Sequence, residues 1–187
     1  AASSILAYGA ECKARIAALP PFDCRQGVIA PITVNGFTVP DSVPFEKNMD
    51  CDRPSMLPYG SESDGQCVPG SRALVLADNE QVQISAFCRN KYHRPGNTTH
   101  FDEVDVIAHS VSSGSTCWFH AEGAGREAPL DGTRVPPPDE AEPPPGHPSA
   151  TEFWKTPEET AAFGCGECHD NDPFYWSPFI AQTGQVP

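Results

Sequence analysis

The sequence predicts an α+β fold that is rich in β-strands and irregular loops, built around a small antiparallel sheet that disulfide bonds cross-link. Three observations carry this prediction. Apolar and polar residues alternate along several segments in the middle of the chain, 21 prolines and 15 glycines interrupt regular structure, and eight cysteines occur among 187 residues. Because prolines interrupt helices, we expect two short ones, one near each end of the chain.

The N-terminal helix is expected within residues 5–19, where apolar side chains recur among good helix formers. Ser3 or Ser4 is a suitable N-cap, and the Pro20-Pro21 pair stops the helix. We therefore predict a short amphipathic helix at this end of the chain.

Strand signals extend from there to residue 121. An Asn35-Gly36 turn separates two short edge strands, and the segments after residue 72 are apolar or alternate between apolar and polar side chains. The predicted strands are residues 28–33, 36–39, 73–76, 81–88, 103–108 and 116–121. We place all of them in a β-rich body that spans residues 1–130.

Two proline triplets separated by acidic residues lie in residues 131–150, a composition that favours an extended polyproline segment. We predict that this proline-rich tether separates the body from a C-terminal segment, residues 151–187, that packs back on the body. The C-terminal segment contains a capping-box pattern at Thr156–Glu159 with proline at the first helical position. This pattern predicts the second helix, from Pro157 to about His169.

The sequence Cys165-Gly166-Glu167-Cys168-His169 at the end of that predicted helix is the strongest chemical signal in the chain. Two thiols three positions apart, followed at once by an imidazole, are the pattern of covalent haem attachment. Each sulfur forms a thioether to one vinyl group, and the histidine binds the iron as its proximal axial ligand. A redox dithiol would not need the histidine, and a zinc site would need a second Cys/His pair at similar spacing, which we do not find.

With Cys165, Cys168 and His169 the chain resembles the monohaem c-type cytochromes, and the likeness covers the motif and its helix. The resemblance implies one covalent haem c and single-electron chemistry. In compact class I members a ligating methionine follows the motif, whereas Met49 and Met56 precede it here. The chain therefore departs from that layout, and the resemblance stops at the c-type cytochromes in general.

Aromatic residues that follow the motif are expected to cover the apolar face of the haem, and we assign this packing to Phe174, Trp176 and Phe179. The sixth iron position decides between two kinds of protein. A protein ligand there gives a closed electron carrier, and an open position gives gas binding or peroxide chemistry. We rank His109 and His100 first among the candidate ligands, which are His93, His100, His109, His120, Met49 and Met56, with His147 less favoured.

The other six cysteines form an even set, which predicts three disulfide bonds in an exported chain. The chain starts without Met or an apolar signal region, as a mature exported protein does after its signal is removed. Disulfides and covalent haem both indicate an oxidising compartment, periplasmic or extracellular. The pairs that we expect are Cys12–Cys24, Cys51–Cys67 and Cys88–Cys117.

The net charge of −13, from 12 basic and 25 acidic residues, argues against nucleic acid and anionic lipid as partners. It favours docking to redox partner proteins that present a basic face. Glu167, Asp170 and Asp172 surround the motif and are candidates for that docking surface. No apolar run approaches the roughly 18 residues that a membrane span needs.

These observations favour an exported cytochrome that transfers single electrons between redox partners over an enzyme. One alternative is a haem enzyme with an open distal site, such as a peroxidase or an oxidase of small nitrogen compounds. In that case Arg94, near His93 and His100, would act on bound oxygen or peroxide. A second alternative is a haem-bearing subunit of a larger redox complex or filament.

Overall fold

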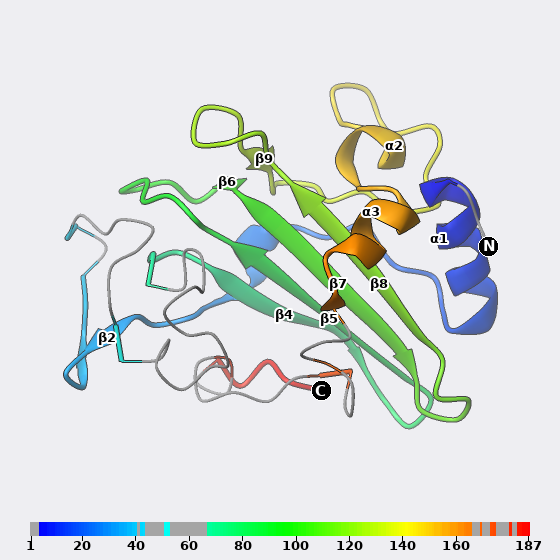
Figure 1. The fold of residues 1–187 in the computed structure, drawn as a ribbon, viewed down its shortest axis with the longest axis horizontal. Helices are drawn as coiled ribbons and strands as arrows, with labels where there is room; N and C mark the ends of the chain where they lie inside the picture. The colour runs from blue at the N-terminus through cyan, green and yellow to red at the C-terminus, as the bar shows by residue number, and fades with distance from the viewer. Residues whose placement is uncertain are drawn as a thin grey trace.

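The computed structural model describes residues 4–40, 42–43, 51–52, 67–165, 169, 173–174, 180 and 183–187. It is a sheet-rich α+β fold, as the sequence predicts, and Figure 1 shows the sheet running diagonally with α1, α2 and α3 gathered at one side. The helices are α1 (Ile5–Arg15), the 3₁₀ helix η1 (Cys24–Gln26), α2 (Ala150–Phe153) and α3 (Pro157–Ala162). The strands are β1 (Val28–Ile29), β2 (Thr33–Val34), β3 (Phe37–Thr38), β4 (Arg72–Asp78), β5 (Val82–Arg89), β6 (His100–Phe101), β7 (Glu103–Ser110), β8 (Thr116–Glu122) and β9 (Leu130–Asp131).

The main sheet has the strand order β1-β4-β5-β7-β8, and every neighbouring pair is antiparallel. Its four longer strands confirm the strands predicted at residues 73–76, 81–88, 103–108 and 116–121. The small pairs β2–β3 and β6–β9 lie outside this sheet. The alternation of apolar and polar residues and the short apolar runs therefore predicted these four strands correctly.

The Asn35-Gly36 turn is also confirmed, because it joins β2 to β3 with φ angles of 50° and 78° at its two residues. Asp52 holds this turn: one carboxylate oxygen accepts from the Asn35 amide and the other from the Gly36 amide, each at 2.7 Å. The Cys51–Cys67 disulfide lies next to Asp52 and connects the hairpin to the chain that enters β4.

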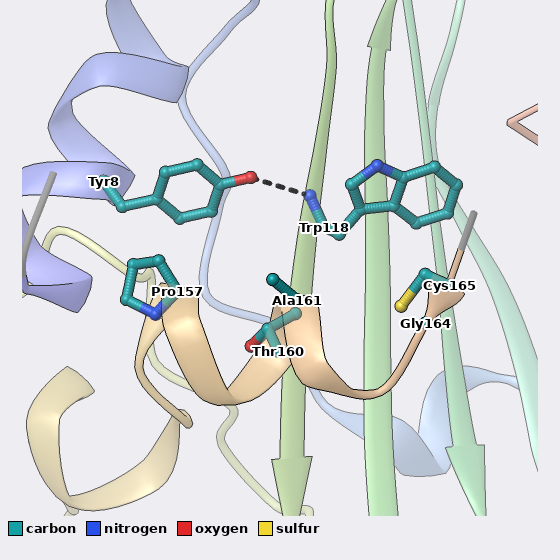
Figure 2. A pocket seen from close by; sticks show the side chains of 7 residues that line it. All are labelled: Tyr8, Trp118, Pro157, Thr160, Ala161, Gly164 and Cys165. Carbon is teal, nitrogen blue, oxygen red and sulfur yellow. Dashed lines mark hydrogen bonds between the residues drawn. The ribbon is translucent and has the colours of Figure 1, made fainter. Parts of the chain in front are cut away.

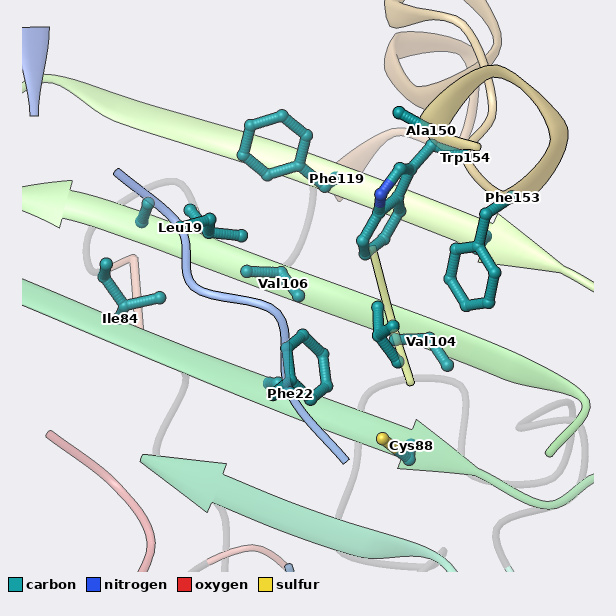
Figure 3. Close-up of a cluster of buried hydrophobic side chains, with 14 of the residues drawn as sticks. Leu19, Phe22, Ile84, Cys88, Val104, Val106, Phe119, Ala150, Phe153 and Trp154 are labelled. Carbon is teal, nitrogen blue, oxygen red and sulfur yellow. The ribbon is translucent and has the colours of Figure 1, made fainter. Parts of the chain in front are cut away.

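One face of the main sheet forms the hydrophobic core, which α1, the chain that follows it and α2 cover (Figure 1). Because successive strand residues point to opposite faces, every second side chain of β5, β7 and β8 enters this core. The Trp154 ring packs 5.9 Å from the Phe119 ring, and its indole N–H donates to the Pro136 carbonyl at 2.9 Å. The core side chains labelled in Figure 3 include Leu19, Phe22, Ile84, Cys88, Val104, Val106, Phe119, Ala150, Phe153 and Trp154.

The opposite face of β7 and β8 faces the C-terminal segment. Alternate residues of both strands point there, since their neighbours on each strand fill the core. Described residues of the C-terminal segment make ring contacts with this face: Phe163 with His120, His169 with Trp118, and Phe174 with His109.

The described residues form three disulfide bonds, as predicted, but two of the expected pairings were wrong. The observed pairs are Cys12–Cys117, Cys24–Cys88 and Cys51–Cys67. The expected Cys88–Cys117 bond fails because β7 separates β5 from β8, and Cys88 aligns through Val104 with Ala121, four residues from Cys117. Standard strand spacings put the two cysteines roughly 16 Å apart, beyond the ~7 Å between Cα atoms that a disulfide tolerates.

The expected Cys12–Cys24 bond fails because these two residues lie over different strands. Cys12 on α1 faces β8, with 6.2 Å between its Cα atom and that of Cys117. Cys24 in η1 faces β5, with 6.0 Å between its Cα atom and that of Cys88. Both bonds therefore join the N-terminal part of the chain to the core face of the sheet.

The N-terminal helix begins as predicted and ends early. Ser4 caps α1, since its hydroxyl oxygen accepts from the Ala7 amide at 3.2 Å. The helix ends at Arg15 because Ile16 leaves the helical region, with φ −122° and ψ −79°. The apolar residues up to Leu19 thus belong to an irregular segment that continues over the core.

Residues 131–150, the proline-rich tether of the sequence prediction, pack closely at several points. Val135 is fully buried, and it exchanges two backbone hydrogen bonds with Phe22. Both terminal nitrogens of Arg134 donate to the Glu140 carboxylate, at 2.8 and 2.6 Å. The domain boundaries at residues 130 and 150 stay a prediction.

Gly9 is where α1 meets this segment most closely, because a Cβ atom there would lie 2.6 Å from the Pro138 carbonyl carbon. We expect Gly9→Ala to lower the free energy of unfolding by about 1–3 kcal/mol through overpacking. Helix propensity alone predicts the opposite sign, a gain of about 1 kcal/mol. Urea unfolding decides between them, with Ala14→Gly on the exposed side of α1 as a control that should cost about 1 kcal/mol. A more stable Gly9→Ala protein would contradict this packing.

None of the helices in the described ranges combines the length and the apolar character that crossing a bilayer requires.

Candidate functional site

Helix α3 positions the first part of the Cys-x-x-Cys-His motif. The Thr156 hydroxyl accepts from the Glu159 amide at 3.2 Å, and the Glu159 carboxylate accepts from the Thr156 amide at 2.8 Å, which completes the predicted capping box. The prediction that this helix continues to His169 was wrong. Gly164 has a φ of 69°, the left-handed conformation that terminates helices, and α3 ends at Ala162.

Two residues of the motif are described beyond this end, and a helix-type hydrogen bond joins them. The His169 amide donates to the Cys165 carbonyl at 3.1 Å. The bond spans four residues, so it holds the first thiol-bearing residue and the imidazole-bearing residue within one turn of each other. Cys168 lies outside the described residues.

A pocket of about 170 Å³ lies beside Cys165, between α1, β8 and α3 (Figure 2). The Tyr8 hydroxyl accepts from the Trp118 amide at 3.1 Å, which fixes α1 against the edge strand β8. Burial raises the pKa of Tyr8, so the phenol stays neutral. The walls are mostly apolar or aromatic and comprise Tyr8, Trp118, Pro157, Thr160, Ala161, Gly164 and Cys165.

Trp118 connects this pocket to the histidine of the motif. Its side chain lines the pocket together with Cys165, and its ring centroid lies 5.1 Å from that of His169. One aromatic residue of the sheet therefore contacts His169 and lines a pocket together with Cys165. Phe174, which we expected to pack on the haem, is buried and makes an edge-on contact with His109, at 6.3 Å between ring centroids. Its packing on a haem stays a prediction.

Next to Trp118 on the same face of the sheet lies a polar cluster of Glu103, Asp105 and His120, whose ligand-type atoms are all within 4.8 Å of one another. Asp105 lies directly opposite His120 in the register of β7 and β8, and its carboxylate is 2.7 Å from Nδ1 of His120. Two cations face the Glu103 carboxylate, Lys91 at 2.6 Å and Arg89 at 3.2 Å.

The ionisable groups of this cluster shift one another's pKa values. Burial by itself would raise the pKa of Glu103, but Arg89, a hydrogen bond with Asp105, and Lys91 lower it to about 2. Burial and the Glu103 charge raise the pKa of Asp105 to about 7. The Asp105 side chain is still 38% exposed, so we attribute the raised pKa more to repulsion from Glu103 than to burial. Burial by itself would lower the pKa of His120, but the hydrogen bond to Asp105 together with the charges of the neighbouring carboxylates raises it.

The other candidate ligands lie in different surroundings. His109 is half-buried on β7, on the same face as Trp118 and His120, and its Nδ1 is 2.8 Å from the Thr116 hydroxyl. His100 lies on β6, outside the main sheet, and contacts Thr99 and Asn97. Met49, Met56, Trp176, Phe179, Glu167, Asp170 and Asp172 lie outside the described residues.

Arg94 is the residue that the enzyme alternative assigns to bound oxygen or peroxide. Its side chain forms hydrogen bonds within the β-rich body. Its two terminal nitrogens donate to the Asp102 carboxylate at 2.9 and 2.6 Å, and one also donates to the Arg126 carbonyl at 2.9 Å. These bonds occupy much of its hydrogen-bonding capacity.

Comparison of the chain with protein-family models, with curated proteins and with solved structures finds no match in any of the three. The functional assignment therefore depends on the residues of this chain and on their arrangement.

The residues present fit one edge of a haem. The site offers a thiol and an imidazole beside apolar and aromatic walls, which suit a flat apolar ring. The pocket is smaller than the roughly 300–1,000 Å³ of sites that enclose a ligand. The described walls would thus cover part of the ring and leave the rest to solvent or to other parts of the chain.

Sequence reasoning did not identify Tyr8, Trp118 or Asp105 as parts of the site. Alternation along β8 would have placed Trp118 beside His120 on one face, and that signal was present in the sequence. The contacts of Tyr8 and Asp105 depend on the docking of α1 and on the register of β7, which no local pattern reveals.

Proposed function

We propose that this protein is an exported monohaem c-type cytochrome that transfers single electrons between redox partner proteins. The observation that carries the proposal is the position of Trp118, whose side chain contacts His169 and shares a pocket with Cys165. The two described chemical groups of the Cys-x-x-Cys-His motif thus lie against one aromatic surface of a disulfide-linked body.

Each residue of the motif has a defined task under this proposal. Cys165 and Cys168 form the thioether bonds, and His169 provides the proximal ligand. Trp118 and Tyr8 cover part of the ring, and Phe174, Trp176 and Phe179 complete the apolar cover. Haem, when bound, supplies a one-electron redox centre whose potential depends on its axial ligands and its exposure.

Two observations favour an electron carrier over an enzyme. The Arg94 guanidinium donates to the Asp102 carboxylate and so links two segments of the β-rich body. The net charge of −13 suits docking to a basic face of a redox partner.

Three disulfide bonds fit an oxidising compartment, and we assign the protein to the periplasm or the extracellular space.

Absorbance spectra of the protein, made in a host that matures c-type cytochromes, test the proposal. We expect a covalent haem that is reduced and reoxidised reversibly and whose spectrum does not change with carbon monoxide. Replacing Cys165 and Cys168 together with alanine should abolish the haem spectrum, whereas Ala161→Ser in the pocket wall should retain it. A wild-type haem that binds carbon monoxide would favour the open-site enzyme instead, and a colourless protein would contradict both.

A further inference from the structure

His120 has one ring nitrogen whose chemistry the fold leaves unused. Its side chain is 2% exposed, and its Nδ1 bonds to Asp105 at 2.7 Å. Among the described residues, nothing accepts from or donates to its Nε2, although this atom is buried. A buried polar atom without a partner destabilises the folded state, and strain, a bound ion or a functional role can account for such an atom in a native protein.

The surroundings of His120 resemble those of a metal-binding histidine. Such a histidine commonly donates its other ring N–H to a carboxylate, which fixes the orientation of the ring and makes the ligating nitrogen more basic. Asp105 supplies that carboxylate here, and in the neutral tautomer that donates from Nδ1 to Asp105 the lone pair lies on Nε2. A metal ion held directly by Glu103, Asp105 and Nδ1 is disfavoured, because Lys91 and Arg89 already face the Glu103 carboxylate.

His120 also lies close to the motif. The Phe163 ring covers it at 3.9 Å between ring centroids, and Phe163 is separated from Cys165 by Gly164 alone. Trp118, which contacts His169, precedes His120 by two residues and therefore points to the same face of the sheet. Phe163 is 53% exposed, so this cover is a surface side chain and not part of the core.

We propose that Nε2 of His120 is the sixth ligand of the haem iron and that Asp105 is its positioning residue. This inference rests on the proposed function. It replaces His109 and His100 as the preferred ligand for a structural reason. Nδ1 of His109 contacts the hydroxyl of Thr116, whereas Nδ1 of His120 contacts the carboxylate of Asp105. His100 is exposed and lies in a different sheet.

A comparison of His120→Ala with His109→Ala tests the proposal in the haem-containing protein. We expect His120→Ala to retain covalent haem, to change from a low-spin to a high-spin spectrum and to bind carbon monoxide. Added imidazole should restore the low-spin spectrum. His109→Ala, from the same face of the sheet, should remain low-spin. A haem-containing His120→Ala that stays low-spin and does not bind carbon monoxide overturns the proposal, as does a high-spin wild type.

His120→Met keeps a ligand in place and covers the case in which His120→Ala does not fold. Methionine ligation raises the reduction potential, so we expect a low-spin protein with a higher potential than the wild type. Asp105→Asn should also stay low-spin with a raised potential, because the imidazole becomes less basic. An unchanged potential in His120→Met overturns the assignment. Absence of covalent haem from the wild type would instead contradict the proposed function, and the haem content is measured first.

Discussion

Replacing Cys12 and Cys117 together with alanine is expected to lower the free energy of unfolding by about 4–5 kcal/mol. The bond joins residues 105 apart in sequence, and the loss of chain entropy in the unfolded state grows with the loop that a disulfide closes. It is also the covalent link that holds α1, and with it Tyr8, against β8. Urea unfolding followed by circular dichroism measures the loss.

The Cys51–Cys67 bond provides the matched control. It joins residues 16 apart in sequence, so its removal should cost about 3 kcal/mol, nearly 2 kcal/mol less than removal of the long-range bond. Replacing both cysteines by alanine in each case avoids new thiols. An equal or reversed order of the two losses would show that loop entropy does not govern these disulfides.

Asp102→Ala is the single substitution from which we expect the largest loss, about 3–5 kcal/mol of unfolding free energy. The Asp102 side chain is 4% exposed and binds Arg94 through both of its oxygens. It also accepts from the amides of Lys91 and Tyr92, at 2.6 and 3.0 Å. Removing the carboxylate leaves two backbone donors and a largely buried guanidinium without this partner.

Asp102→Asn removes the negative charge of this side chain and keeps its shape, so it separates the two contributions to stability. The amide oxygen still accepts one or two of these bonds, so we expect a smaller loss than for alanine. Glu11→Ala breaks an exposed ion pair with Arg15 and should change stability by no more than about 0.5 kcal/mol. Unfolding curves for the three variants measure these losses in unfolding free energy. An Asp102→Ala protein as stable as Glu11→Ala would contradict the claim that the Asp102 carboxylate stabilises the fold.

The strands of the body could be predicted because alternation is a local signal. Residues 81–88 and 103–108 alternate along their length, and they form β5 and β7 in adjacent positions. The disulfide pairing could not be predicted, because it depends on which strand α1 and η1 each lie over. The early end of α3 at Ala162 had a visible signal, since Gly164 follows it and glycine is the usual helix terminator, but the cysteine motif beyond it suggested continuation.

The motif of the candidate site is visible in the sequence, and its task in binding haem stays a prediction. Its surroundings could not be predicted. Cys165, Cys168 and His169 are a contiguous pattern, readable without a structure. The partnership of Asp105 with His120 needs the register between β7 and β8, because one residue of slip would place the two side chains on opposite faces of the sheet. The choice among the histidines therefore required the assembled sheet.

Intact mass under denaturing conditions, combined with a pyridine haemochrome assay, tests the central claim most directly. A chain matured in a competent host should keep one haem mass after unfolding, and that mass should be lost when both cysteines of the motif are replaced. A wild-type chain with the mass of the bare polypeptide, from a host that matures other c-type cytochromes in the same experiment, would contradict the account.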